Sequence, residues 1–301
     1  MQQDLGRALV SVARLPPDSP QLDGWAVRSG TTAEVAYFGA WRAGRLVGAS
    51  GVRATSASHA YTRLHVEPPA RRQGVGRALV QAVLGWADQR GLQWVTATVV
   101  AGSDGEAFAA ALGASILLHL VTVVRDLGKP VPCVAAPPGV RLLRWPDHAP
   151  DEWLQAYAAL RRAVGDAPDA HLQMDVDART ATWVRDWERA HTATGDELWV
   201  CAAVAEATGE LVGFTEAHVP TAGAADQHDT AVLPAWRGQG IGTWLKAEML
   251  AWLQVERPAV ETLTSTINQR NTPMLRVSAA VGFRQAARRL LVGFDVTDSS
   301  S

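Results

Sequence analysis

The chain has 301 residues, which is enough for two domains of ordinary size. Apolar residues make up 48% and charged residues 19% of the sequence, a balance typical of a folded globular protein rather than a disordered one. The formal net charge is −2 and no face is rich in Lys and Arg, so the sequence gives no sign of a nucleic-acid partner.

Hydrophobic periodicity predicts a mixture of strands and helices in the first part of the chain. Residues 35–41 and 46–50 are two apolar runs on either side of a glycine turn, which predicts a hairpin. Residues 76–89 carry apolar side chains at helical spacing. The other expected strands are 10–14, 61–66, 94–100 and 116–124, and the other expected helices are 105–112 and a weaker one at 25–30.

Residues 126–139 contain four prolines and two glycines and read as a linker. We therefore expect an N-terminal domain at 1–127, a linker at 128–138 and a C-terminal domain at 139–301. The second half repeats the order of the first, and each half combines hairpins with a strand, loop, helix and strand, which predicts an α+β fold. The strands expected in the second half are 140–144, 199–204, 211–218, 229–232, 260–266 and 290–296, and the helices are 151–162, 177–191, 243–253 and 273–281.

One short loop occurs once in each half, in matching context. Each copy follows an extended apolar segment and a proline, and each opens a helical pattern. Such a turn leaves backbone N–H groups unpaired at the start of the helix, where they and the helix dipole bind phosphate. The copies are Arg71-Arg72-Gln73-Gly74-Val75-Gly76-Arg77 and Arg237-Gly238-Gln239-Gly240-Ile241-Gly242-Thr243.

The spacing of the glycines distinguishes between phosphate ligands. Neither copy has the lysine of a P-loop or the third glycine of a dinucleotide fingerprint. Both copies fit Arg-x-x-Gly-x-Gly, which resembles the acyl-CoA-binding motif of the GNAT superfamily of N-acetyltransferases. The resemblance covers nearly the whole chain, once per half, and is fuller in the second half. It implies two tandem GNAT-like domains, each a mixed, mostly antiparallel sheet flanked by helices.

The resemblance also implies acetyl-CoA as cosubstrate and a set of residues that bind it. The loop N–H groups would hold the pyrophosphate, and the strand before each loop would carry a bulge and part from its neighbour to admit the pantetheine arm. The thioester would lie near Val232 and Leu233 in the second half, with His65 and Val66 as the equivalents in the first. Asn268 and Asn271 would bond the parted strand or the pantetheine, although Asn271 also suits a helix N-cap.

Acetyl transfer to an amine requires a base that takes the amine proton and an acid that protonates the leaving thiolate. Glu216 is a carboxylate in the middle of an expected strand, which makes it the first candidate for the base, and Asp229 at the start of the loop strand is the second. A solvent-facing or salt-bridged Glu216 and a turn-capping Asp229 are the structural alternatives. The tyrosine that many family members use as the acid is absent, because Ser278 and Ala109 occupy its positions.

The remaining features concern partners and location. Cys133 and Cys201 have neither metal-binding nor disulfide spacing, which favours a reducing cytoplasm and no metal. No apolar stretch is long enough for a membrane span. The sequence thus predicts a cytoplasmic N-acetyltransferase for a small-molecule amine, with catalysis in the second half. A non-catalytic acyl-CoA sensor or scaffold, and an enzyme using a longer acyl-CoA, are the alternatives.

Overall fold

The computed structural model describes residues 10–16, 19–22, 35–172, 179–192 and 195–297. They form two compact units: the first contains the described residues up to 117 together with 290–297, and the second contains 118–289. The weak helix expected at 25–30 lies outside the described residues. Of the helices within them, none has the length and apolar composition needed to cross a bilayer.

The first unit is a sheet covered by helix α1, and its strands are ordered β1-β2-β3-β4-β5-β12. Helix α1 begins directly after the first glycine loop and buries Val75, Leu79, Val83 and Trp86, which recur at helical spacing, against the sheet. The neighbours are antiparallel as far as β4, and β4 and β5 are parallel. The elements are β1 (Ser11–Leu15), η1 (Pro20–Leu22), β2 (Val35–Arg42), β3 (Arg45–Ala54), β4 (His59–Val66), η2 (Pro68–Ala70), α1 (Val75–Asp88), β5 (Trp94–Val100), α2 (Asp104–Ala111) and the start of β6 (Ser115–Asp126).

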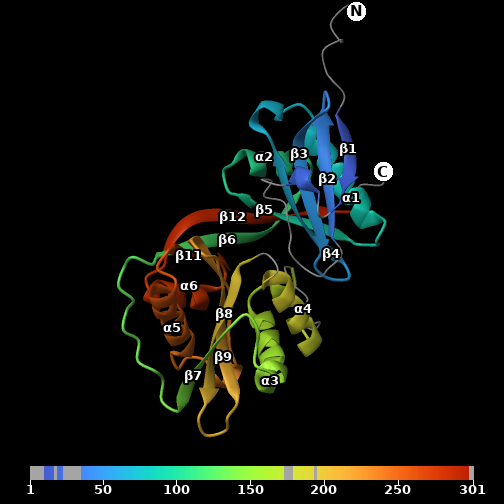
Figure 1. The fold of residues 1–301 in the computed structure, drawn as a ribbon. Helices are drawn as coiled ribbons and strands as arrows, with labels where there is room; N and C mark the ends of the chain where they lie inside the picture. Colours follow the sequence, from blue (N-terminus) through green and yellow to red (C-terminus); the bar gives the residue numbers. More distant parts are fainter. Residues whose placement is uncertain (1–9, 17–18, 23–34, 173–178, 193–194, 298–301) are drawn as a thin grey trace, which may run out of the picture. The chain divides into compact units, whose positions relative to one another are not determined.

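The second unit is a sheet with helices on both faces, and its strands are ordered β12-β6-β11-β10-β9-β8-β7. In Figure 1, α5 and α6 lie on one face, and α3 and α4 lie on the other. Strand β8 is buried on both sides because Trp199 and Cys201 face α5, whereas Leu198 and Val200 face α3 and α4. The elements are β7 (Val140–Pro146), α3 (Asp151–Arg162), η3 (Ala163–Asp166), η4 (Ala170–Leu172), α4 (Ala181–Thr192), β8 (Glu197–Ala205), β9 (Leu211–Val219), β10 (Gly223–Val232), η5 (Pro234–Trp236), α5 (Ile241–Glu256), β11 (Val260–Asn268), α6 (Thr272–Ala280) and β12 (Arg284–Asp295).

Strands β10 and β11 pair for only part of their length. Their parallel pairing ends at Asp226 and Thr264, after which β10 continues beside β9 alone. The register between β10 and β9 shifts between Gln227 and Thr230, which marks a β-bulge. The second unit therefore has the bulged and parted strand that the family resemblance implied. In the first unit β4 parts from β5 after Tyr61, but its pairing with β3 continues without a shift.

The last strand is divided between the units. Its first residues, Arg284–Arg289, belong to the second unit, and Leu290–Asp295 belong to the first, where they lie next to β5. In the first unit Leu290, Val292 and Phe294 pack against Val80 and Ala109. The first unit thus takes one strand of its sheet from a distant part of the chain.

Candidate active site

The two glycine loops have the same backbone conformation. Gly74 and Gly240 precede their helices with φ values of 84° and 85°, and Arg72 and Gly238 are also left-handed, with φ values of 60° and 77°. Only glycine adopts such values without strain, which explains the two glycines at the equivalent positions 74 and 240. No atom lies within 4 Å of where a side chain would begin at Gly74 or Gly240, so the space beside these two glycines is open.

The loop arginines stabilise the turn from within. The Nε atom of Arg71 donates to the carbonyl of Val66 at 3.2 Å, and that of Arg237 donates to the carbonyl of Val232 at 2.9 Å. Arg237 also pairs with Asp166. The loop glutamines also donate hydrogen bonds to backbone carbonyls. The Nε2 atom of Gln73 donates to the Pro69 carbonyl at 2.7 Å, and that of Gln239 donates to the Ala235 carbonyl at 3.3 Å.

The start of α5 has backbone N–H groups of the kind that bind phosphate. The first helical hydrogen bond there runs from the Trp244 N–H to the Gly240 carbonyl at 3.0 Å. The preceding N–H groups have no intrahelical acceptor and stand at the positive end of the helix dipole. The side chain of Ile241 is buried in the core, so this residue offers the groove only its backbone.

A cavity of about 730 Å³ lies over the second loop. It runs along β10 from Thr230 to Val232, and Arg276 and Val277 of α6 form part of its wall. Leu233 and Gln239 do not line it. The residues predicted to bind the cofactor that do line it are Val232, Arg237, Gly238, Gly240, Ile241, Gly242, Thr243 and Asn271.

A smaller cavity of about 290 Å³ lies where β10 and β11 part. Its wall includes Asp226, His228 and Asp229 of the bulged strand, and Lys246 of α5. The two cavities are adjacent and have six residues in common: Val164, Ala167, Pro168, Thr230, Asn271 and Met274. A ligand anchored on the glycine loop can therefore extend into the gap between the strands.

The two predicted asparagines have structural roles and also line these cavities. Asn271 caps α6, accepting the Met274 N–H at 3.2 Å. Asn268 lines the smaller cavity and donates to the Pro168 carbonyl at 2.9 Å and to Asp169 at 3.2 Å. Asn268 thus bonds the connection before α4 rather than strand β10.

The first loop is more crowded than the second. A side chain added at Gly76 would meet the ring of Phe108 at 2.9 Å, whereas at Gly242 the nearest atoms, from Val232 and Val277, are 3.9 Å away. Both Phe108 and Val277 precede the glycine that ends their helix by five residues. Of the other predicted residues of the first loop, Val75 is buried, Val66 is half-buried, and His65, Arg71, Arg72, Gln73, Gly74 and Arg77 are exposed.

Glu216 belongs to a buried charge cluster on the α3 face of the sheet. It is fully buried, accepts the Tyr157 hydroxyl at 2.6 Å and pairs with Arg161. Arg161 is also buried, 4.0 Å from the centre of the Trp187 ring. Burial raises the pKa of Glu216 despite the adjacent guanidinium. Glu216 lines neither cavity.

Asp229 lies at the edge of the same cluster and does line the smaller cavity. Its Oδ2 atom accepts Arg179 at 2.9 Å and lies 3.5 Å from Arg161, and its side chain is 19% exposed. Burial alone would raise the pKa of Asp229, but the two guanidinium groups outweigh it and hold the pKa below its usual value. Asp226, 59% exposed, is the more accessible carboxylate of this cavity.

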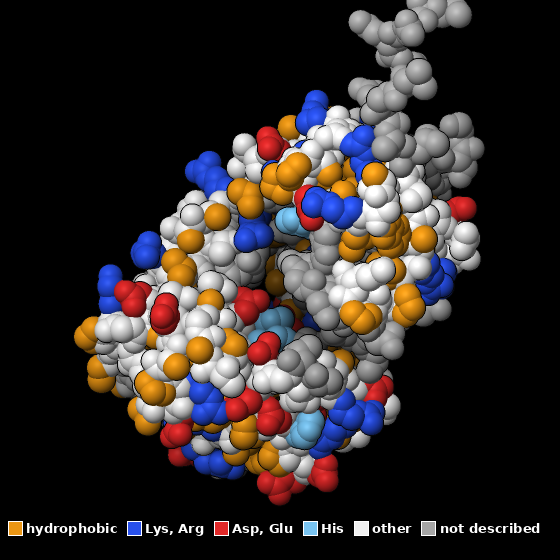
Figure 2. Space-filling view, turned by 45° about the horizontal axis from the view of Figure 1, so that its top comes forward, with side chains coloured by type: hydrophobic (Ala, Val, Ile, Leu, Met, Phe, Trp, Pro, Cys, Tyr) orange, Lys and Arg blue, Asp and Glu red, His pale blue; other side chains and the backbone are white. Residues whose placement is uncertain are grey.

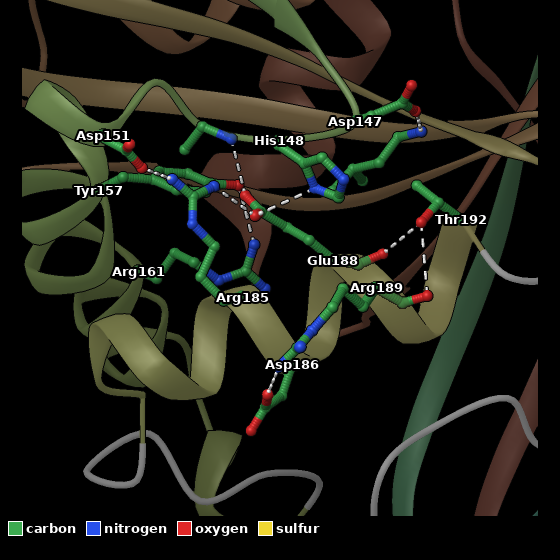
Figure 3. A network of polar contacts seen from close by, with 12 residues as sticks. Asp147, His148, Asp151, Tyr157, Arg161, Arg185, Asp186, Glu188, Arg189 and Thr192 are labelled. Atoms are coloured by element: carbon green, nitrogen blue, oxygen red, sulfur yellow. Dashed lines mark hydrogen bonds and ion pairs between the residues drawn. The ribbon is translucent and has the colours of Figure 1, made fainter.

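A second polar network fixes the helices that carry this cluster (Figure 3). The buried Glu188 of α4 accepts the Ala149 N–H at 2.9 Å and Arg185 at 2.8 Å. Arg185 also reaches Asp151 at the start of α3 at 2.5 Å. Helix α4 is thereby tied to the segment that leads into α3, where Tyr157 and Arg161 are placed.

The sequence reasoning did not identify Arg161, Tyr157, Arg179, Gln227 or Lys246. Helical spacing puts Tyr157 and Arg161 on one face of α3, but nothing in the sequence showed that this face meets Glu216. The sequence contains one weak indication that Lys246 is unusual: it is a lysine among Leu245, Ala247 and Met249 in a strongly apolar helix.

Comparison with known proteins identifies the class to which this fold and site belong. The model of the Acetyltransferase (GNAT) family matches residues 7–113 and 158–283, which is most of the chain and includes both glycine loops. The chain therefore belongs to the GNAT acetyltransferase family. This confirms the family and the α+β fold predicted from the sequence.

Among curated proteins, the chain is similar to mycothiol acetyltransferases. That of Mycolicibacterium paratuberculosis is 31% identical over 196 residues, which are 63% of this chain and 58% of the relative. That of Salinispora arenicola is 30% identical over 236 residues, 73% of this chain and 68% of the relative.

Among solved structures, the tandem GNAT protein from the clavulanic acid biosynthesis pathway is similar over 96% of this chain and 99% of its own, with a TM-score of 0.79 and 25% identity. A GCN5-related N-acetyltransferase from Sphaerobacter thermophilus shares the fold, with a TM-score of 0.65 and 17% identity, over 86% of this chain and 80% of its own.

Proposed function

We propose that this protein transfers an acetyl group from acetyl-CoA to the amine of a small molecule, and that turnover takes place in the second unit. The observation that carries the proposal is the pair of adjacent cavities: the larger starts at the glycine loop, and the smaller ends between two parted strands. A long phosphorylated cosubstrate fits the first, and a small acceptor fits the second.

In this arrangement the N–H groups at the start of α5 bind the CoA pyrophosphate. The pantetheine arm follows β10 past Val232 toward Thr230, and the thioester lies near the boundary of the two cavities. The loop of the first unit has the same conformation, and we propose it as a second CoA site.

The acceptor binds in the smaller cavity, where Asp226 and Asp229 attract an amine that arrives protonated. The similarity to mycothiol acetyltransferases and to a tandem GNAT protein from the clavulanic acid biosynthesis pathway supports a small-molecule acceptor over a protein. Deprotonation requires a base: Asp229 is the predicted carboxylate that reaches the cavity, and Glu216 is the more basic group behind it.

The test measures release of CoA thiol from acetyl-CoA with a panel of small amines. Gly242→Asp places a carboxylate in the larger cavity at a position without a positive φ, and we expect it to abolish acetyl-CoA binding at the second loop and, with it, thiol release. Arg77→Asp makes the equivalent first turn of α1 acidic and should retain more activity than Gly242→Asp.

Three outcomes would contradict the proposal. Acetyl-CoA binding without thiol release from any amine would favour a sensor or scaffold. Faster turnover with a longer acyl-CoA would change the cosubstrate. A greater loss with Arg77→Asp than with Gly242→Asp would move catalysis to the first unit.

A further inference from the structure

Lys246 is a buried lysine that faces the smaller cavity. It lies in the second turn of α5 with 1% of its surface exposed, and it is part of the cavity wall. Its Nζ atom donates to the Oε1 atom of Gln227 and lies 5.3 Å from the centre of the Phe283 ring. Among the described residues, no carboxylate lies within ion-pair distance of it.

The arrangement around Lys246 orients its ammonium group. Gln227 donates from its own Nε2 atom to Thr215 at 2.9 Å, which fixes the amide and turns its oxygen toward the lysine. An ammonium has three N–H donors, and the contact with Gln227 occupies one of them. A buried charge with no counter-ion is costly, so its retention at a cavity wall suggests a role toward a ligand.

The proton on Lys246 is also easily given up. Burial lowers the pKa of Lys246 from an ordinary value of 10.5 to about 7. A group with such a pKa exchanges its proton efficiently at neutral pH. The residue at the position of the family's usual tyrosine, Ser278, is 1% exposed and has a hydroxyl that is far less acidic.

We propose that Lys246 donates the proton that the departing CoA thiolate requires, in place of the missing tyrosine. The inference rests on the function proposed above. The tetrahedral intermediate collapses, its C–S bond breaks and the electron pair moves to sulfur. A proton passes from Nζ to sulfur, which leaves CoA thiol and a neutral lysine. The carbonyl of the amide re-forms, the base releases the amine's proton to water, and a proton from water in the cavity returns to Lys246.

Other titratable groups face the same cavity. Asp226, His228 and Asp229 line it from β10, while the residues that line it from the other elements, apart from Lys246 itself, carry no charge. The β10 groups belong to the acceptor side of the cavity. His228 can also change its charge near neutral pH, so the dependence of kcat on pH in the Lys246 variants must be compared with that in His228→Gln.

The first experiment compares acetyl transfer by Lys246→Met, Lys246→Arg and Lys246→Gln with the wild type. Methionine removes the charge, and arginine retains a charge but holds its proton too tightly to donate it. We expect all three to lower kcat by about 10²-fold with little change in the KM for acetyl-CoA. The fall in wild-type kcat as Lys246 loses its proton should disappear in the variants but persist in His228→Gln. Lys129, the other lysine of the chain, is exposed, and Lys129→Met is the matched control.

The second experiment does not depend on turnover. The thiol of bound CoA is titrated by its thiolate absorbance in the wild type and in Lys246→Gln, which can still bond Gln227. Below about pH 7 Lys246 is protonated, and an ammonium beside sulfur favours the thiolate, so we expect a larger thiolate fraction in the wild type than in the variant in that pH range.

The outcomes separate the two proposals. Full kcat in Lys246→Met together with an unchanged thiol titration would overturn the role of Lys246 and leave the proposed function intact. Lysine-dependent thiol titration without transfer to any amine would support Lys246 at the sulfur and contradict the proposed function. Loss of kcat in Lys246→Met but not in Lys246→Arg would show that charge, rather than proton donation, is what matters.

Discussion

At the scale of single residues, Glu216 and Asp229 differ in the two properties that a general base needs. Glu216 has the raised pKa but is fully buried, and Asp229 reaches the cavity but is held ionised by two arginines. A base must have both access to the amine and a pKa near the working pH. In this cluster Glu216 has the raised pKa and Asp229 has the access, and both side chains contact Arg161.

We expect Asp229→Asn to lower kcat/KM near neutral pH by about 10²-fold or more, because it removes the carboxylate nearest to the acceptor. The deficit should shrink as the pH approaches the pKa of the acceptor amine, since the free amine is then already neutral. Asp226→Asn, at the exposed carboxylate that attracts the same amine, should instead raise the KM of the acceptor and leave kcat unchanged.

Glu216→Gln separates a chemical role from a positional one. The variant breaks the buried pair with Arg161 in either case, so we expect the free energy of unfolding to fall by about 3–5 kcal/mol. If Glu216 also takes the proton, kcat/KM of the folded variant falls near neutral pH and recovers at high pH; if Glu216 is only the counter-charge of Arg161, the deficit does not depend on pH in this way. Full activity in both Asp229→Asn and Glu216→Gln would contradict either assignment.

Lys246 should make stability depend on pH. Its pKa is about 7 in the folded chain and ordinarily 10.5, so unfolding takes up a proton between these values. The free energy of unfolding should therefore rise as the pH rises from about 7 toward 10.5, and should carry the full cost of the buried charge below about 7. Lys246→Met removes that cost.

We accordingly expect the melting temperature of Lys246→Met to exceed that of the wild type by the widest margin near pH 6, with the margin narrowing toward pH 10. Each kcal/mol corresponds to roughly 2–4 °C in a domain of this size. Calorimetry at several pH values measures the effect, and Lys129→Met should follow the wild type throughout. A margin that does not vary with pH would contradict the lowered pKa.

At the scale of elements, the sequence predicted those whose side chains repeat clearly. The glycine loops and helices α1, α3 and α5 lie where apolar periodicity put them, within three residues at each end. The start of β10, Gly223–His228, was missed because it is small and polar, and its pairing with β9 and β11 makes it a strand. The start of β12 was also missed, because its arginines and small residues give no apolar strand pattern.

The backbone geometry of the candidate site was predictable. The glycine pattern predicted two turns of the same conformation, and Asp229 lies beside the bulge expected in β10. Lys246 and Arg161 could not be found in this way, because burial and the choice of partner are decided by which helix faces meet across the sheet. Positive and negative side chains are scattered over the face shown in Figure 2, so charge alone did not mark the site.

Helix α2 decides how open the first loop is. The ring of Phe108 lies 2.9 Å from where a side chain would begin at Gly76. At Gly242, the equivalent glycine of the second unit, Val277 lies 3.9 Å away. If both loops bind acetyl-CoA, we expect the first to bind more weakly, and Phe108→Val to narrow the difference in calorimetric titration. Val277→Phe is the reciprocal variant and should weaken binding to the second loop. Equal affinities of the two loops for acetyl-CoA in the wild type would show that the Phe108 side chain moves aside when the ligand binds.

At the scale of the whole molecule, two copies of one loop have been retained with unequal surroundings. The second unit has the bulged strand, the paired cavities, the carboxylates and the buried lysine. The first has an intact loop and an unbulged β4. Such a division is consistent with turnover in one unit, while the other is free to bind CoA or to support the fold.

The divided strand β12 has a consequence for biosynthesis. A ribosome completes β5 of the first unit and then the whole second unit before it adds Leu290–Asp295, the neighbour of β5 in the sheet. At a translation rate of about 5–20 residues per second, the edge of β5 stays unpaired for many seconds before Leu290–Asp295 are made. An unpaired edge invites pairing with other chains, so translation speed and chaperone supply should affect the yield of this protein.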